Sequence, residues 1–153
     1  MEEKTYTILE LFEIKRVLEQ LLILKGTGLT FLITKNIYEL NIIGEKYKSN
    51  IKTLKKKFTI QNSEGKPKRF LLNEKNELVY ENEKPVETVN DSLRSTTLID
   101  QSNEYLEALE KFNEEPHKIC FVCINEKNIQ ELCEKNIIEG IDLSPLYGNV
   151  IIK

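Results

Sequence analysis

The sequence predicts an α+β protein that is mostly helical, with a long helical hairpin, a β-hairpin tip, and a small sheet plus a short helix at the base. Two patterns carry this prediction: a long apolar repeat of helical spacing, and short β-branched runs between turn residues later in the chain. The chain has 153 residues, 40% of them hydrophobic and 31% charged, and is long enough to bury a core. We expect a single domain over residues 1–153, with residues 45–98 forming a protruding arm and tip.

The longest regular pattern runs from about Leu29 to Phe58, where apolar residues recur at alternating steps of four and three. This heptad spacing is typical of a helix that lies against partner helices along one side. We call these positions the seam: Ile33, Ile37, Leu40, Gly44, Tyr47, Ile51, Leu54 and Phe58. Such a helix would be roughly 45 Å long, which is more than a small chain is expected to cover. The apolar seam residues are therefore predicted to bind a protein partner, which includes a second copy of this chain.

The residues before this helix predict an antiparallel neighbour for it. Thr5–Ile8 is typical of a short strand, and Thr7 is placed to cap a helix over Leu9–Leu24 that has a broad apolar stripe. The glycines within residues 25–28 are expected to end that helix, and the short connection then makes a helical hairpin. Gly44 either allows another backbone to approach closely or marks a kink.

Beyond the long helix the pattern changes to turns and short strands. Residues 61–67 are rich in turn formers. Phe70–Leu72 and Leu78–Tyr80 are short apolar runs separated by Asn73–Glu77, which predicts a β-hairpin. Residues 81–95 are polar and are expected to be irregular.

A returning helix is expected next. Thr97 and Asp100 form a candidate capping box, and an apolar face follows as far as Asn113, before Pro116 stops the helix. This helix would be roughly 24 Å long, about half the length of the one it returns along.

The last part of the chain contains the clearest strand. Lys118–Ile124 is β-branched, aromatic and short, and Thr5–Ile8 is its expected pairing partner. Asn125 is placed to cap a short helix over Glu126–Lys135, and residues 141–152 are expected to hold a turn and a last strand.

Charge is unevenly distributed along the chain. Residues 45–69 carry nine basic and two acidic residues, whereas residues 70–116 carry four basic and twelve acidic residues. The basic residues of the first segment are Lys46, Lys48, Lys52, Lys55, Lys56, Lys57, Lys66, Lys68 and Arg69, which we call the basic block. A nucleic-acid-binding protein that uses Lys46–Arg69 is therefore the alternative function. A solvated helix face, neutralisation by the following acidic segment, or an acidic protein partner would explain the same block.

Residues with metal-ligand chemistry are few. His117, Cys120, Cys123 and Cys133 are the one grouping that could hold Zn²⁺. A strand over Lys118–Ile124 would point Cys120 and Cys123 to opposite faces, so we expect small buried cysteines, no metal and no cofactor. A catalytic triad would have to use the single histidine, at an element boundary, and no other reaction motif is found, so we expect no enzyme.

Three stretches carry a resemblance: Phe31–Leu40, which opens a lysine-rich helix, the turn Glu64–Pro67, and His117–Ile119, which opens a strand. In this order they resemble an uncharacterised family of small helical proteins encoded by phages and prophages of Gram-positive bacteria. The resemblance implies a viral context. We expect a non-enzymatic phage-encoded protein that acts through protein contacts, as a virion or assembly component or as an inhibitor of a host defence system. Its location would be the host cytoplasm or the virion, without membrane contact, because the longest apolar run, Leu21–Leu24, is short.

Overall fold

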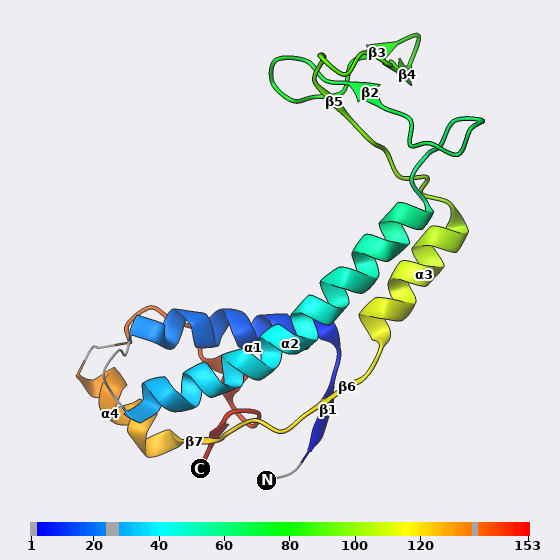
Figure 1. Ribbon diagram of the computed structural model, residues 1–153. Coiled ribbons are helices and arrows are strands. Elements are labelled where there is room, and N and C mark those ends of the chain that lie inside the picture. The colour runs from blue at the N-terminus through cyan, green and yellow to red at the C-terminus, as the bar shows by residue number, and fades with distance from the viewer. Residues whose placement is uncertain (1–2, 24–27, 136–137) are drawn as a thin grey trace. The chain divides into compact units, whose positions relative to one another are not determined.

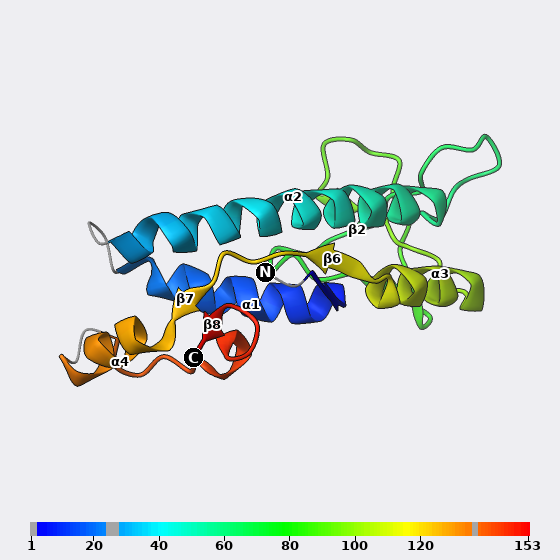
Figure 2. The same ribbon diagram turned by 90° about the horizontal axis from the view of Figure 1, so that it is seen from below.

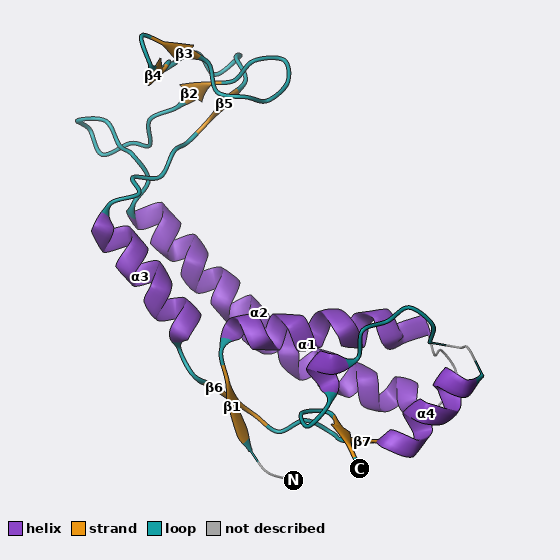
Figure 3. Ribbon diagram, turned by 180° about the vertical axis from the view of Figure 1, so that it is seen from behind, coloured by secondary structure: helices purple, strands orange, loops and turns teal. Residues whose placement is uncertain are grey.

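The computed structural model describes residues 3–23, 28–135 and 138–153 (Figure 1). Helices make up most of the regular structure and the strands are short (Figure 3), so the α+β, mostly helical class is confirmed. The chain divides into two compact units. Unit 1 comprises Met1–Ser49 and Lys111–Lys153, and unit 2 comprises Asn50–Glu110, which contains most of the predicted arm.

The helices and strands of the described residues are short, with one exception. The helices are α1 (Ile8–Gln20), the 3₁₀ helix η1 (Leu21–Ile23), α2 (Gly28–Lys57), α3 (Asn103–Glu114), α4 (Glu126–Glu134) and the 3₁₀ helix η2 (Ser144–Leu146). The strands are β1 (Lys4–Tyr6), β2 (Phe70–Leu71), β3 (Tyr80–Glu81), β4 (Lys84–Pro85), β5 (Ser95–Thr96), β6 (His117–Ile119), β7 (Ile124–Asn125) and β8 (Ile151–Ile152). Each sheet formed by these strands is a single pair.

Helix α1 begins at the predicted cap. The backbone N–H of Thr7 donates to the Glu10 carboxylate at 2.7 Å, and the Thr7 hydroxyl accepts from the Glu10 N–H at 3.4 Å. This reciprocal pair satisfies two backbone groups that a helix start leaves open. The helix ends at Gln20 and continues as η1, a few residues before the predicted end. Of the expected glycine stop, residues 25–27 lie outside the described residues, and Gly28 begins α2.

Helix α2 is continuous from Gly28 to Lys57, within one residue of the predicted bounds. Its unit 1 part runs antiparallel to α1, as expected for a helical hairpin (Figures 1 and 2). The prediction that another backbone approaches Gly44 closely is wrong, because the neighbouring atom belongs to a side chain. A Cβ added at Gly44 would lie 3.6 Å from Cε1 of Phe12, which is ordinary van der Waals contact.

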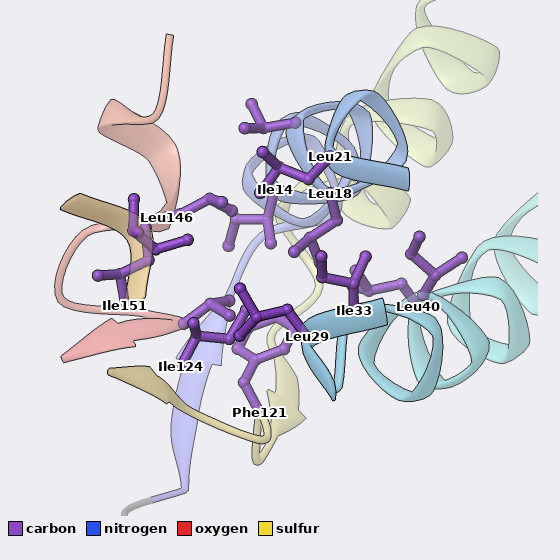
Figure 4. Packing of buried hydrophobic residues seen from close by; sticks show 14 of the residues in the cluster. Ile14, Leu18, Leu21, Leu29, Ile33, Leu40, Phe121, Ile124, Leu146 and Ile151 are labelled. Carbon is purple, nitrogen blue, oxygen red and sulfur yellow. The ribbon is translucent and has the colours of Figure 1, made fainter. Parts of the chain in front are cut away.

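The core of unit 1 lies between α1, α2 and the segments that follow α3 (Figure 4). Side chains from α1 face those from α2, and residues near β7 and η2 close the remaining side. The labelled members are Ile14, Leu18, Leu21, Leu29, Ile33, Leu40, Phe121, Ile124, Leu146 and Ile151, and each is buried. Complete burial of one such side chain contributes roughly 1.5–3 kcal/mol to folding, so this cluster dominates the stability of unit 1.

The predicted pairing of the first strand with the strand after Pro116 is confirmed. Strands β1 and β6 are antiparallel, with Lys4 opposite Ile119 and Tyr6 opposite His117. The predicted continuous strand Lys118–Ile124 is wrong, because β6 ends at Ile119 and the chain becomes a strand again only at β7. Strand β7 then pairs in parallel with β8, and Asn125 caps α4 as expected, accepting from the Lys127 N–H at 2.9 Å.

A buried side chain explains the break in that strand. Asn36 of α2 is 1% exposed and faces Val122. Its amide oxygen accepts from the Val122 N–H at 2.7 Å, and its amide nitrogen donates to the Val122 carbonyl at 2.8 Å. The side chain thus replaces a neighbouring strand for both backbone groups of Val122.

The predicted hairpin at the tip is confirmed only around its turn. Leu72 and Leu78 form an antiparallel bridge across the Asn73–Glu77 turn. The flanking residues pair elsewhere: β2 with β5, and β3 with β4. Because β5 and β4 lie within residues 81–95 or just at their end, that segment is more ordered than expected. Its turn uses positive φ at Asn82 and Glu83, which suits a two-residue hairpin but is not signalled by a glycine.

Two turns of unit 2 share one construction. The side-chain oxygen of Asn62 accepts from the N–H groups of Glu64 and Lys66, at 2.9 and 3.0 Å. The Asn73 oxygen likewise accepts from Lys75 and Glu77, at 2.9 and 3.0 Å. The fourth residue of each turn, Gly65 or Asn76, has positive φ. Asparagine therefore closes both turns by satisfying backbone donors from its side chain.

Helix α3 begins later than the predicted capping box. The Ser102 hydroxyl accepts from the Tyr105 N–H at 3.3 Å and caps the helix at Asn103. Thr97 and Asp100 precede it in extended chain, where the Asp100 N–H donates to the Phe58 carbonyl at 2.8 Å. The capping-box prediction is wrong because pairing with the chain after α2 holds residues 98–100 extended.

Candidate functional site

The seam is largely buried within the chain. Ile33, Leu40 and Leu54 are 0, 2 and 8% exposed, and Ile37 is also buried. The remaining apolar members, Tyr47, Ile51 and Phe58, are partly buried. The expectation that the seam has more apolar surface than the chain covers is therefore wrong.

The rings that pack on the two aromatic seam residues come from the same unit as each residue. In unit 1, α1 supplies them: the Phe12 ring lies edge-on to Tyr47, with ring centroids 5.7 Å apart. In unit 2, α3 does so, and the Phe58 and Tyr105 rings lie 5.5 Å apart. A second chain therefore has little of the seam left to bind.

The opposite side of α2 carries a second stripe, which sequence reasoning missed. Phe31, Tyr38 and Ile42 are 71, 63 and 52% exposed. Together with Lys35 they recur at steps of four, three and four, and we call these four residues the outer stripe. Each lies two positions before a seam residue, and two residues turn a helix by about 200°.

Within unit 1 the other elements lie on one side of α2 (Figure 2), so the outer stripe is open to solvent. Exposed single apolar residues are ordinary, but aromatic and branched side chains aligned on one helix face are a typical contact surface. The signal in the sequence was this second apolar phase within the same heptad.

The basic block is partly neutralised within the chain. Lys68 pairs with Glu87 at 2.9 Å, and Lys66 with Glu64 at 3.4 Å. Arg69 donates from Nε to the Ser95 hydroxyl at 2.8 Å. Further pairs join Lys48 to Glu45 at 3.1 Å and Lys57 to Glu104 at 3.8 Å. These contacts are exposed and individually weak, yet they hold much of the block against acidic or polar neighbours.

All six lysines of the block on α2 have exposed side chains, and three that take part in no ion pair in the described residues lie close together. These three are Lys52, Lys55 and Lys56. Because Lys55 and Lys56 follow Lys52 by three and four residues, the three side chains share one side of the helix. This is the part of the basic block that a phosphate backbone could contact.

The histidine and the cysteines do not form a site in the described residues. Cys120 and Cys133 are exposed, Cys123 is half-buried, and the three are free thiols, so the expectation of small buried cysteines is wrong. Within residues 3–23, 28–135 and 138–153, no group of three His, Cys, Asp or Glu side chains could hold a metal ion. His117 Nε2 is buried without a hydrogen-bond partner, and His117 lines neither of the hollows near β1.

Two hollows adjoin Tyr6, with volumes of about 330 and 480 Å³. The Tyr6 hydroxyl donates to the Asn149 side-chain oxygen at 3.1 Å, and Lys4 Nζ donates to the Gly148 carbonyl. Burial raises the pKa of the Tyr6 hydroxyl, and the nearby Glu10 and Cys123 raise that pKa further. The polar atoms of Tyr6 and Lys4 are thus bonded to the chain itself, which favours a structural role over a catalytic one.

No helix in the described part of the chain has the length and apolar character needed to cross a membrane. Comparison with known proteins finds no matching family model, curated protein or solved structure.

Proposed function

We propose that this protein acts by binding another protein, without catalysing a reaction, and that the outer stripe is its contact surface. The observation that carries the proposal is the exposure of Phe31, Tyr38 and Ile42 on one face of α2. Aromatic side chains supply much of the affinity of protein interfaces. Each buries a large apolar area in the interface and loses little side-chain conformational entropy.

The opposite face of the same helix supports this surface. The seam residues fix α2 in the unit 1 core, so the outer stripe is presented by a helix that needs no ordering on binding. A helix that offers residues at steps of four and three fits either a groove or another helix. The resemblance to phage-encoded proteins adds a setting, in which the contact serves virion assembly or blocks a host defence, in the host cytoplasm or the virion.

Affinity capture with matched variants tests this proposal. A tagged Phe31→Ser/Ile42→Ser variant removes apolar contacts of the outer stripe, and Leu9→Ser/Val89→Ser removes two exposed apolar side chains elsewhere. Wild type and the control variant should retain the same bound protein, counting untagged copies of the chain, and the stripe variant should lose it. The circular dichroism spectra of wild type and the two variants should be equal, because the replaced side chains are exposed. Equal retention by the stripe variant would contradict the proposal.

Nucleic-acid binding is the second candidate, favoured by Lys52, Lys55 and Lys56 on α2. Fluorescence anisotropy at low salt, with labelled single- and double-stranded DNA, tests it. If this candidate holds, wild type should bind with steep salt dependence, and Lys52→Glu/Lys55→Glu/Lys56→Glu should lose that binding. Equal anisotropy for wild type and the variant would remove this candidate.

A further inference from the structure

We infer that the occupant of the outer stripe is a second copy of this chain, whose α2 lies antiparallel to the first. The inference rests on the proposed function and names its partner. It places Phe31 against Ile42 of the second copy, and Lys35 against Tyr38 of the second copy.

The spacing of the outer stripe gives this register. An antiparallel pairing centred midway between Lys35 and Tyr38 brings every member of the stripe opposite another member. Phe31 and Ile42, both more than half exposed, then cover each other at the two ends. The two-fold axis makes each contact occur twice, as in an isologous interface. An apolar group thus meets an apolar group at both ends, and a cation meets an aromatic ring twice near the axis.

Charge selects the antiparallel arrangement. In a parallel pair in register, Lys35 would lie beside Lys35 of the second copy, and like charges there are repulsive. In the antiparallel pair Lys35 lies over the face of Tyr38 of the second copy, where a cation is attracted by the ring. Glu39 directly follows Tyr38 in that helix, so this register also brings its carboxylate near the ammonium group of Lys35.

The charged groups are available for this contact. Lys35 and Glu39 are exposed, and within the described part of the chain neither takes part in an ion pair. The aliphatic stem of Lys35 can lie along the apolar stripe while its ammonium group reaches the edge. The contact is one helix face, smaller than the ~800 Å² per partner of typical stable interfaces. We therefore expect a dissociation constant on the order of micromolar or weaker.

Sedimentation velocity on two charge variants tests the inference. Wild-type protein should shift from monomer to dimer across the micromolar range. Lys35→Glu alone and Glu39→Lys alone should each dimerise at least about tenfold more weakly, because like charges then face each other twice. An equimolar mixture of the two variants should regain dimerisation, since every Glu then faces a Lys. Lys52→Glu, an exposed lysine of α2 outside the stripe, should behave as wild type.

Two outcomes would overturn the inference. One is wild-type protein that stays monomeric up to several hundred micromolar, and the other is a mixture that dimerises no better than either variant alone. Neither outcome removes the proposed function by itself. If wild type is monomeric but the Phe31→Ser/Ile42→Ser variant loses a captured protein, the stripe binds a different protein and only this inference fails. If capture is also unchanged, both fail.

Discussion

Unit 1 and unit 2 are each stabilised internally by a different kind of contact. Unit 1 has a continuous cluster of buried apolar side chains that includes Leu18, Ile33 and Ile124. Unit 2 is described throughout, and its buried apolar side chains are Leu54, Phe70 and Tyr105. Its shape depends instead on short strand pairs and on turns closed by side chains. A segment with few buried contacts opens at lower free energy, so unit 2 is expected to open while unit 1 remains folded.

The largest expected difference between the two units is in the stability lost when a buried apolar side chain is truncated. Leu18→Ala should lower the free energy of unfolding of unit 1 by about 2–5 kcal/mol, because it leaves a cavity in a closed core. Phe70→Ala should disorder the strand pairs of unit 2 and leave the midpoint of unit 1 unchanged. Urea denaturation by circular dichroism measures the first effect, and hydrogen exchange at residues 70–96 measures the second. If Phe70→Ala lowers the midpoint of unit 1 as much as Leu18→Ala does, the two units unfold together and the comparison fails.

A smaller difference is expected between the stability losses caused by replacing two asparagines, one in each unit. Asn36→Ala should destabilise unit 1 by roughly 1–3 kcal/mol, because it leaves the N–H and carbonyl of the partly buried Val122 unpaired. Asn73→Ala should cost about 1 kcal/mol or less, and only locally, since water reaches the N–H groups of its exposed turn. Thermal denaturation and hydrogen exchange measure the two effects. The exposed Asn41→Ala is the control, with an expected change within ~0.5 kcal/mol, and an equal loss at Asn36 and Asn41 would refute the role of Asn36.

The effects expected at two glycines are small and have opposite signs. Gly44→Ala should stabilise unit 1 by up to about 1 kcal/mol, because a Cβ fits against Phe12 and alanine favours a helix. Gly65→Ala should destabilise the turn in unit 2 by roughly 1–2 kcal/mol, because φ there is +76°. Gly65→Asn is the matched control and should be milder, since Asn76 holds the same position of the sister turn at φ 60°. Chemical denaturation measures the change in stability of Gly44→Ala, and hydrogen exchange measures that of Gly65→Ala. A loss of stability in Gly44→Ala would mean that Phe12 has no room to accommodate the methyl group.

Features governed by neighbouring residues were predictable from the sequence. The Thr7 cap, the length of α2 and the Asn125 cap each depend on residues within one or two helical turns. The pairing of β1 with β6 was also found, because each strand has few alternatives in so helical a chain.

Features governed by distant residues were not predictable in the same way. The break after β6 depends on Asn36, which is 86 positions away from Val122. The start of α3 depends on pairing of residues 98–100 with the chain after Lys57, which overrides a plausible capping sequence. The outer stripe was missed because α2 has apolar residues in two heptad phases, and a pattern alone does not say which phase the rest of the chain covers.

Asn36 also determines the axial position of α2. A slide of the helix by one turn, about 5.4 Å, would replace the amide by Ile33 or Leu40 and leave the peptide of Val122 against hydrocarbon. A single polar residue at a buried helix position excludes such shifted packings. Since both faces of a helix move together, the axial position at which Phe31, Tyr38 and Ile42 are exposed is set from inside the molecule, by a buried amide on the opposite face.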